Sequence, residues 1–159
     1  MKKSLLFVCL GNICRSPAAE AVFLKKIKEQ SLENYFSVDS AGTGGWHVGN
    51  PADSRMREAA FKRGIDITSK ARKISLQDFQ IYDLILTMDN SNLRDIKLLA
   101  DDVGDNNIST IAPILSYASN TDLIEVPDPY YGGDSGFESV LDLLEDAIEG
   151  LLLTFNFED

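Results

Sequence analysis

The feature that most constrains this chain is the run VCLGNICRSP at positions 8–17, which places Cys9 and Arg15 six positions apart. The apolar residues 5–8 before it predict a buried strand, and Ser16-Pro17 is typical of a helix N-terminus. A tight loop between a strand and a helix N-terminus directs backbone N–H groups at an anion. We therefore expect residues 10–15 to surround one group of anionic oxygens, with Arg15 adding a bidentate fork.

Cys9 stands at the start of this loop, beneath the expected anion. A helix N-terminus and a neighbouring cation both favour the thiolate over the thiol. We therefore expect Cys9 to be ionised at neutral pH and aimed at the phosphorus of a bound phosphate. The alternative is a buried structural cysteine, which is the commoner role of a lone cysteine. The nucleophilic role is favoured over the structural one because the loop also contains Gly11, Asn12 and the pair Ser16-Pro17 at the positions that such a loop requires.

Length and charge limit the remaining possibilities. A chain of 159 residues is expected to form a single domain over 1–159. Its net charge of −10 argues against nucleic-acid or membrane partners, which need a basic face. The N-terminal pattern is not that of a signal peptide, and no run approaches the ~18 apolar residues of a membrane span. The two cysteines are too close in sequence for a disulfide between them to stabilise the fold, which favours a reducing, cytoplasmic setting. We expect a monomer.

Apolar patterning predicts strands that alternate with helices. Strands are expected at 4–9, 35–40, 82–88 and 108–111, and helices at 17–30, 53–63, 75–80, 89–100 and 135–153. This alternation predicts an α/β fold of three layers, with a central four-stranded parallel sheet flanked by helices. The phosphate-binding loop then joins the first strand to the first helix. Ligands bind beyond the carboxyl ends of such strands, where Cys9 is placed.

The chain resembles the low-molecular-weight protein tyrosine phosphatases. The matching segments are 7–17, 39–43, 83–89 and 128–133, in the family's order. The resemblance implies hydrolysis of phosphotyrosine in proteins, and of small aryl phosphates, through a cysteinyl phosphate on Cys9. Arg15 and the loop amides would hold the phosphate, and Asp128 would be general acid and then general base. Inorganic phosphate is the expected product, and no cofactor or metal is expected.

The resemblance also extends to the residues around Cys9. The phosphate is expected to be bound by the loop residues Leu10, Gly11, Asn12, Ile13, Cys14 and Ser16. Asp128 lies between two prolines, which restrict its backbone, although an Asp-Pro pair alone would indicate only a turn.

Three small residues of the loop have further expected roles. Ser16 is expected to cap the helix and also to hydrogen-bond the Cys9 thiolate, and of these two roles the residues alone favour the cap. Asn12 is expected to adopt a left-handed backbone, and the resemblance implies a hydrogen bond to Ser40. Cys14 is either a buried small residue or a thiol that traps oxidised Cys9 as a disulfide. The resemblance favours the protective role.

Aromatic residues are expected to wall the pocket. Trp46, Tyr130 and Tyr131 would form a slot for a flat phenyl phosphate, although Trp46 can also be an ordinary exposed loop residue. His47, the only histidine, is expected to be exposed and not catalytic.

One position departs from the family pattern. Ser69 stands where many members have a histidine that contacts Asp89. Because Ser69 carries no charge, Asp89 needs another partner, either Arg72 or a helix N-terminus. The basic residues between 55 and 73 belong either to the mouth of the site or to a solvated helix face.

Two other functions compete with the phosphatase. A thiol-dependent arsenate reductase shares the scaffold, but it needs further thiols, and the chain has only Cys14 besides Cys9. A non-catalytic phosphate-binding module would need neither Cys9 nor Asp128. A metal site is disfavoured because two cysteines and one histidine supply few ligands.

Overall fold

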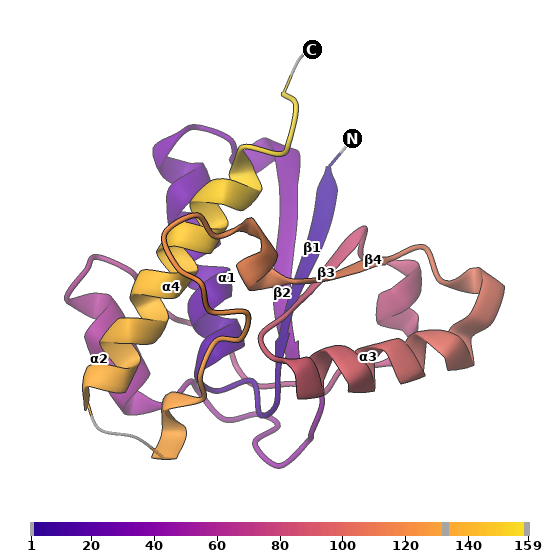
Figure 1. The fold of residues 1–159 in the computed structure, drawn as a ribbon, viewed down its shortest axis with the longest axis horizontal. Coiled ribbons are helices and arrows are strands. Elements are labelled where there is room, and N and C mark those ends of the chain that lie inside the picture. The colour runs from indigo at the N-terminus through magenta and orange to yellow at the C-terminus, as the bar shows by residue number, and fades with distance from the viewer. Residues whose placement is uncertain (1, 132–133, 158–159) are drawn as a thin grey trace.

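The computed structural model of the chain describes residues 2–131 and 134–157, and its centre is a parallel sheet (Figure 1). The sheet contains β1 (Lys3–Cys9), β2 (Phe36–Gly42), β3 (Leu84–Thr87) and β4 (Thr110–Pro113), in the order β2-β1-β3-β4. The α-helices are α1 (Arg15–Glu29), α2 (Ser54–Phe61), α3 (Asn90–Val103) and α4 (Asp134–Leu152). Short 3-10 turns are η1 (Glu33–Tyr35), η2 (Leu76–Gln80), η3 (Gly104–Asn106), η4 (Ile114–Tyr117) and η5 (Pro129–Tyr131). The predicted four-stranded α/β fold is confirmed.

Strand β1 separates two apolar layers, because successive side chains of a strand point to opposite faces. Leu5 and Phe7 belong to the core beneath α1, α2 and α4, whereas Leu6 and Val8 belong to the core beneath α3 and η2. Figure 1 shows these two groups of helices on opposite sides of the sheet. A strand that is buried on both faces has an uninterrupted apolar sequence, which is why β1 was easy to predict.

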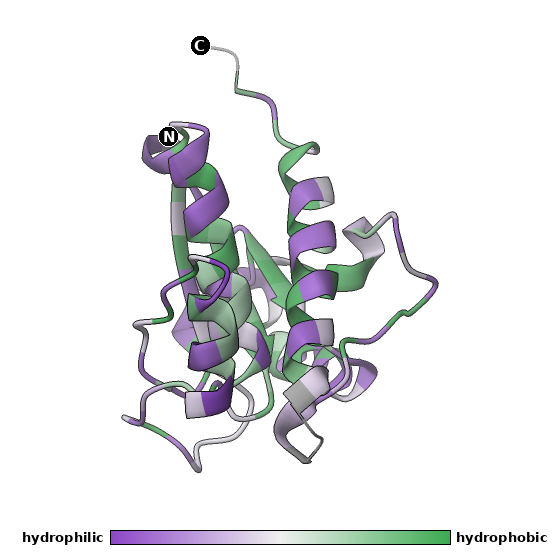
Figure 2. Cartoon of the chain, turned by 90° about the vertical axis from the view of Figure 1, so that its left-hand side faces the viewer, coloured by the Kyte–Doolittle hydropathy of each residue, from purple (hydrophilic) through white to green (hydrophobic). Residues whose placement is uncertain are grey.

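Helix α4 packs beside α1 on the same side of the sheet. Its buried residues include Val140, Leu141, Leu144, Ile148 and Leu151, which recur at helical spacing. Figure 2 shows polar bands along the side of α4 that faces away from the sheet. Within the described residues, no helix combines the length and the apolar character that crossing a membrane requires.

Local chemistry explains where some elements begin and end. A capping box of Ser75 and Asp78 is present at the start of η2. Helix α3 continues past its expected end to Val103 and stops before Gly104, which has a φ of 66°. The strand expected at 108–111 is found at 110–113 instead, because Ile108 donates its N–H to the carbonyl of Phe79 in η2.

Gly150 provides a test of the packing between α4 and η4. A Cβ atom at Gly150 would collide with the carbonyl oxygen of Tyr117, which is main chain and cannot rotate away. Alanine gains about 1 kcal/mol of helix propensity, but overpacking costs about 1–3 kcal/mol, and a main-chain clash belongs at the upper end. We expect Gly150→Ala to lower the free energy of unfolding by about 2 kcal/mol in urea titrations.

Gly136 of the same helix is the matched control. A Cβ atom there would lie 3.6 Å from the Pro129 side chain, which is an ordinary contact. Gly136→Ala should therefore leave stability unchanged or raise it slightly. Equal losses for the two substitutions would contradict the packing argument.

Candidate active site

The loop between β1 and α1 points its carbonyl groups outward. The carbonyl oxygens of Cys9, Leu10 and Ile13 accept hydrogen bonds of 2.8–2.9 Å from backbone N–H groups in the segment 43–53. Among the described residues, the N–H groups of Gly11, Ile13 and Cys14 have no acceptor within hydrogen-bonding distance. The loop therefore presents partial positive charge on its inner side, as an anion site requires.

Asn12 holds the turn of this loop. Its φ of 57° confirms the predicted left-handed backbone, and its N–H donates to the Cys9 sulfur at 3.3 Å. Its side-chain NH₂ donates to the Ser16 hydroxyl oxygen at 2.7 Å. The expected bond from Asn12 to Ser40 is wrong, because the Ser40 hydroxyl donates to Glu20 at 2.5 Å instead.

Ser16 contacts the sulfur of Cys9. The Ser16 oxygen lies 3.0 Å from the Cys9 sulfur, and both residues are buried. The expected helix cap is wrong, because α1 already begins at Arg15, with Cys14 at the N-cap position and no side-chain cap. Ser16 lies inside the first turn, so its hydroxyl faces the loop. Since the Asn12 amide donates to the Ser16 oxygen, the Ser16 proton has two acceptors within reach, the Cys9 sulfur at 3.0 Å and the Ala41 carbonyl oxygen at 3.4 Å. The sulfur is the nearer of the two.

Arg15 is fixed through one of its terminal nitrogens. Nη1 donates to Asp89 at 2.7 Å and to the carbonyl of Val126 at 3.0 Å, and the side chain is 3% exposed. Nη2 lies 3.7 Å from Asp128. Burial opposes the charge of Arg15, but Cys9, Asp89 and Asp128 raise the pKa of its guanidinium. Within the described chain, Nε and Nη2 have no hydrogen-bond acceptor, so they are available to an anion.

Asp89 interacts with a helix N-terminus, which is one of the two partners expected to replace the histidine of other family members. One carboxylate oxygen accepts from the Asn92 N–H at 2.8 Å and caps α3, while the other binds Arg15. The alternative partner Arg72 is wrong, because its guanidinium pairs with Asp39 and Asp78.

Ser69 lies near the carboxylate of Glu20, which accepts a hydrogen bond from Ser40. Burial raises the pKa of Glu20, and the two serine hydroxyls oppose that rise only in part.

A cavity of about 350 Å³ opens above the loop. It is lined by Cys9, Leu10, Gly11, Ile13, Cys14, Arg15, Trp46, His47, Asp128 and Tyr130. The side chains of Asn12 and Ser16 lie behind the loop and do not line this cavity. The site thus brings together the three predicted catalytic residues and two of the predicted aromatic walls. The side chain of Tyr131, the third predicted wall, lies outside the part of the chain that the structure describes.

The loop after β2 supplies one wall of the cavity. The Trp46 ring folds over Gly44, where any Cβ atom would collide with it, and 72% of Trp46 is exposed. The expectation that His47 is exposed is wrong, since it is half-buried and its ring lies 3.0 Å from the position of a Cβ atom on Gly11. His47 follows a run of glycines, and nothing in that pattern indicates contact with the phosphate loop.

Arg55 supports the part of the wall formed by Tyr130, and it belongs to the basic segment expected either at the mouth of the site or on a solvated helix face. Asp128 accepts a hydrogen bond from the Tyr130 N–H at 3.0 Å, and Arg55 donates to the Tyr130 carbonyl at 3.1 Å. The Arg55 guanidinium also lies 5.5 Å from the centre of the Tyr130 ring and pairs with Asp53 at the N-cap of α2. Of the basic residues 55–73, Arg55 thus belongs to the mouth of the site, whereas Arg63 and Arg72 form ion pairs elsewhere.

Comparison with known proteins agrees with this geometry. Residues 4–158 match the family model of low molecular weight phosphotyrosine protein phosphatases. A low molecular weight protein-tyrosine-phosphatase of Bacillus subtilis is 43% identical over 156 residues, covering 98% of this chain and 97% of the relative. The human low molecular weight phosphotyrosine protein phosphatase is 47% identical over 138 residues, covering 87% of this chain and 86% of the relative.

Solved structures are similar as well. A crystal structure of a protein tyrosine phosphatase from Entamoeba histolytica superposes with a TM-score of 0.90 at 44% identity, covering 96% of both chains. The fold and site define an α/β enzyme built to hold a phosphoryl group. The chain belongs to the low-molecular-weight protein tyrosine phosphatases, and it hydrolyses phosphotyrosine to release phosphate.

The buried carboxyl group of Glu20 predicts a specific pH dependence of stability. Its pKa is raised in the folded state, whereas an unfolded glutamate titrates near about 4.3. Above that pH the native state retains a proton that the unfolded state has lost, so stability falls as pH rises through the folded pKa. Glu20→Gln keeps an acceptor for Ser40 but cannot titrate. We expect the variant to lose less stability than the wild type between pH 5 and pH 8 in urea titrations.

Glu33→Gln is the control, because it removes the same charge at an exposed position. If the stability of Glu20→Gln and that of Glu33→Gln depended on pH in the same way, burial of Glu20 could not be the cause.

Proposed function

We propose that Cys9, Arg15 and Asp128 carry out the phosphatase reaction in this cavity. The observation that supports this most strongly is the polarity of the loop, whose N–H groups at Gly11, Ile13 and Cys14 have no acceptor among the described residues. Three N–H groups and the unused Nε and Nη2 of Arg15 match the oxygens of a phosphate monoester. The Cys9 sulfur lies at the base of the same cavity.

In the first step, the Cys9 thiolate attacks phosphorus and forms an S–P bond as the bond to the phenolic oxygen breaks. The Asn12 N–H and the Ser16 hydroxyl stabilise the thiolate before attack. The loop N–H groups and Arg15 hold the phosphoryl oxygens as their charge redistributes in the transition state. Asp128, at the rim of the cavity, donates its proton to the departing oxygen.

In the second step, a water molecule attacks the cysteinyl phosphate and Asp128 takes up the proton that the water loses. The S–P bond breaks, phosphate leaves, and the Cys9 thiolate is restored. A bound phosphate dianion also competes with Asp128 for Nη2 of Arg15, which lies 3.7 Å from the carboxylate in the free protein.

The walls of the cavity support selection of aryl phosphates. Trp46 and Tyr130 both line it, and Tyr131 is assigned to the same wall from the sequence. His47 adds a polar edge near Gly11. A seryl or threonyl phosphate is too short to carry its peptide clear of these walls while its phosphorus reaches Cys9.

The setting of the enzyme is also part of the proposal. Both cysteines are free and buried, which is compatible with a reducing cytoplasm, and the net charge of −10 disfavours nucleic-acid partners, membrane partners and association with like copies. We assign the chain as a single-domain monomer that acts on phosphotyrosine proteins without a metal or cofactor.

Two substitutions test the assignment of the catalytic residues. Cys9→Ser should abolish steady-state hydrolysis of an aryl phosphate measured without added metal. Asp128→Asn keeps the acceptor for Tyr130 but cannot supply a proton, and it should lower kcat by about 10²–10⁴-fold. Asp122→Asn, which removes a charge from an exposed position nearby in the sequence, should leave the rate unchanged.

Turnover that survives Cys9→Ser would exclude the cysteinyl phosphate. Failure of freshly reduced wild type to turn over would favour arsenate reduction or phosphate binding instead. The arsenate reductase would need thiols beyond Cys14, and the binding module would keep its affinity for phosphate in Cys9→Ser.

The protective role of Cys14 is tested with peroxide. Burial raises the pKa of the Cys14 thiol, so peroxide should oxidise Cys9 first, to a sulfenic acid. Attack by the Cys14 sulfur then forms a disulfide and releases water, and a thiol reductant reverses it. We expect activity to recover in the wild type and to be lost permanently in Cys14→Ser. Equal recovery in both would leave Cys14 with only a packing role.

A further inference from the structure

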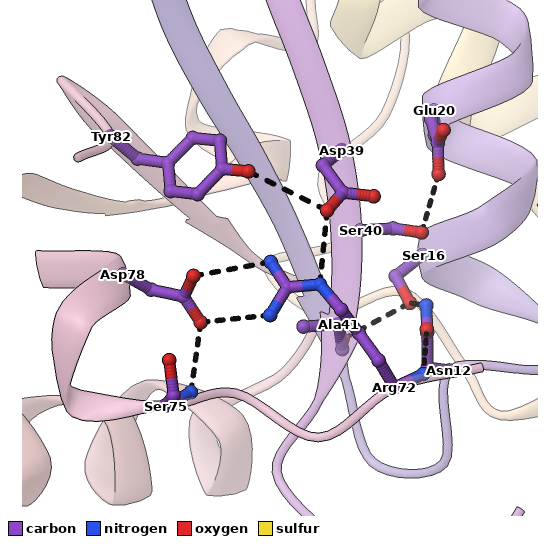
Figure 3. A network of polar contacts seen from close by, with 10 residues as sticks. All are labelled: Asn12, Ser16, Glu20, Asp39, Ser40, Ala41, Arg72, Ser75, Asp78 and Tyr82. Carbon is purple, nitrogen blue, oxygen red and sulfur yellow. Dashed lines mark hydrogen bonds and ion pairs between the residues drawn. The ribbon is translucent and has the colours of Figure 1, made fainter. Parts of the chain in front are cut away.

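Arg72 is joined to the Cys9 sulfur by a short chain of hydrogen bonds. The Arg72 backbone N–H donates to the Asn12 side-chain oxygen at 3.0 Å, and the Asn12 NH₂ donates to the Ser16 oxygen at 2.7 Å. The Ser16 oxygen lies 3.0 Å from Cys9. Figure 3 shows Asn12 and Ser16 beside the backbone of Arg72.

The N–H of residue 72 decides which way the Asn12 amide faces. A backbone N–H can only donate, so it pairs with the amide oxygen and leaves the NH₂ for Ser16. If the amide were reversed, its oxygen would face Ser16 and attract the hydroxyl proton. The Ser16 hydroxyl could then no longer donate a hydrogen bond to the Cys9 sulfur. The position of one backbone N–H therefore determines whether the Ser16 proton is available to stabilise the thiolate.

The side chain of Arg72 anchors this backbone position. Its Nε donates to Asp39 of β2 at 2.9 Å, and Nη1 and Nη2 donate to the two oxygens of Asp78 at 3.0 and 3.2 Å (Figure 3). Asp78 is itself fixed, because it accepts the Ser75 N–H at 2.8 Å in the capping box of η2. A guanidinium held by two carboxylates on different elements has little freedom to move.

The backbone around Arg72 transmits this anchoring to two parts of the site. The Arg72 carbonyl accepts the N–H of Gly42 at 2.8 Å, at the carboxyl end of β2. The adjacent Ala71 exchanges backbone hydrogen bonds with Gly49 and Asn50, which follow Trp46 and His47 in the cavity wall.

We infer that Arg72 is a positioning residue of the reaction, which acts on Cys9 through Asn12 and Ser16. Arg72 touches neither the cavity nor the sulfur. Its guanidinium holds residue 72 in place, residue 72 orients the Asn12 amide, and the amide directs the Ser16 proton at the thiolate. The inference rests on the proposed nucleophilic role of Cys9.

The test compares two arginines that are both held by carboxylates. Arg72→Met removes the fork that binds Asp39 and Asp78. Arg63→Met removes a guanidinium that binds Glu138, Asp142 and Glu145 at 2.8–3.3 Å. Arg63 connects the end of α2 to α4 and has no contact with the phosphate loop, so its loss should reduce stability without affecting Cys9.

The measurement is the rate of inactivation by iodoacetate as a function of pH, which reports the thiolate of Cys9. Arg72→Met should move the midpoint of this profile upward by about one pH unit, because a hydrogen bond to a charged group is weakened. Activity lost at low pH should return as pH rises through the new midpoint. Arg63→Met should keep the wild-type midpoint. The charged and titratable groups that line the cavity with Cys9, which are Cys14, Arg15, His47 and Asp128, are unchanged in both variants.

A double substitution tests the route through Asn12. In the Asn12→Ala background, Arg72→Met should cause no further shift, since the link is already broken. Additive shifts would overturn the inference, and so would an unshifted midpoint in folded Arg72→Met. If Arg72→Met does not fold, Arg72→Lys and Asp39→Asn each weaken the anchor, and each should shift the midpoint in the same direction. Failure of the proposed function would look different, because wild type itself would show neither turnover nor inactivation at Cys9.

Discussion

The catalytic edge of this protein depends on the orientation of the peptide groups in the loop 9–15. The carbonyls of Cys9, Leu10 and Ile13 accept hydrogen bonds from the segment 43–53, while the N–H groups of Gly11, Ile13 and Cys14 are left for an anion. That arrangement requires the loop and the end of β2 to lie very close, and a Cβ atom at Gly42 would stand 2.7 Å from the Leu10 carbonyl oxygen. The glycine-rich connection after β2 is thus a structural part of the phosphate site as well as one wall of its cavity.

The elements that local chemistry determines could be predicted from the sequence. The apolar run of β1, the capping box at Ser75 and the left-handed turn at Asn12 each depend on residues close together in the chain. The partners of hydroxyl groups could not be predicted in this way. Ser16 has both a helix terminus and a sulfur within reach, and only the folded loop shows that its oxygen faces Cys9. Ser40 binds Glu20 across two elements, which no local pattern indicates.

The arginines show the same limit. Positions 55–73 form a basic segment in an acidic chain, and sequence alone leaves open whether it faces a substrate or solvent. In the fold, Arg63 is bound by carboxylates of α4, and Arg72 by one carboxylate of β2 and one of η2. Arg55 combines an ion pair with a contact to the Tyr130 loop. The three arginines therefore have different roles, which depend on the part of the backbone that each guanidinium holds in place.

Asp89 shows how the sheet, a helix and the anion site are coupled through one carboxylate. One oxygen caps α3 and the other binds Nη1 of Arg15. Because Nη1 also donates to the Val126 carbonyl, two residues before the proposed acid Asp128, the guanidinium links the end of β3 to the acid loop. Nη1 already donates to Asp89 and to the Val126 carbonyl, which leaves Nε and Nη2 to bind phosphate. A lysine at position 15 would provide a single nitrogen for both tasks, so the site needs the planar fork of arginine and not only its charge.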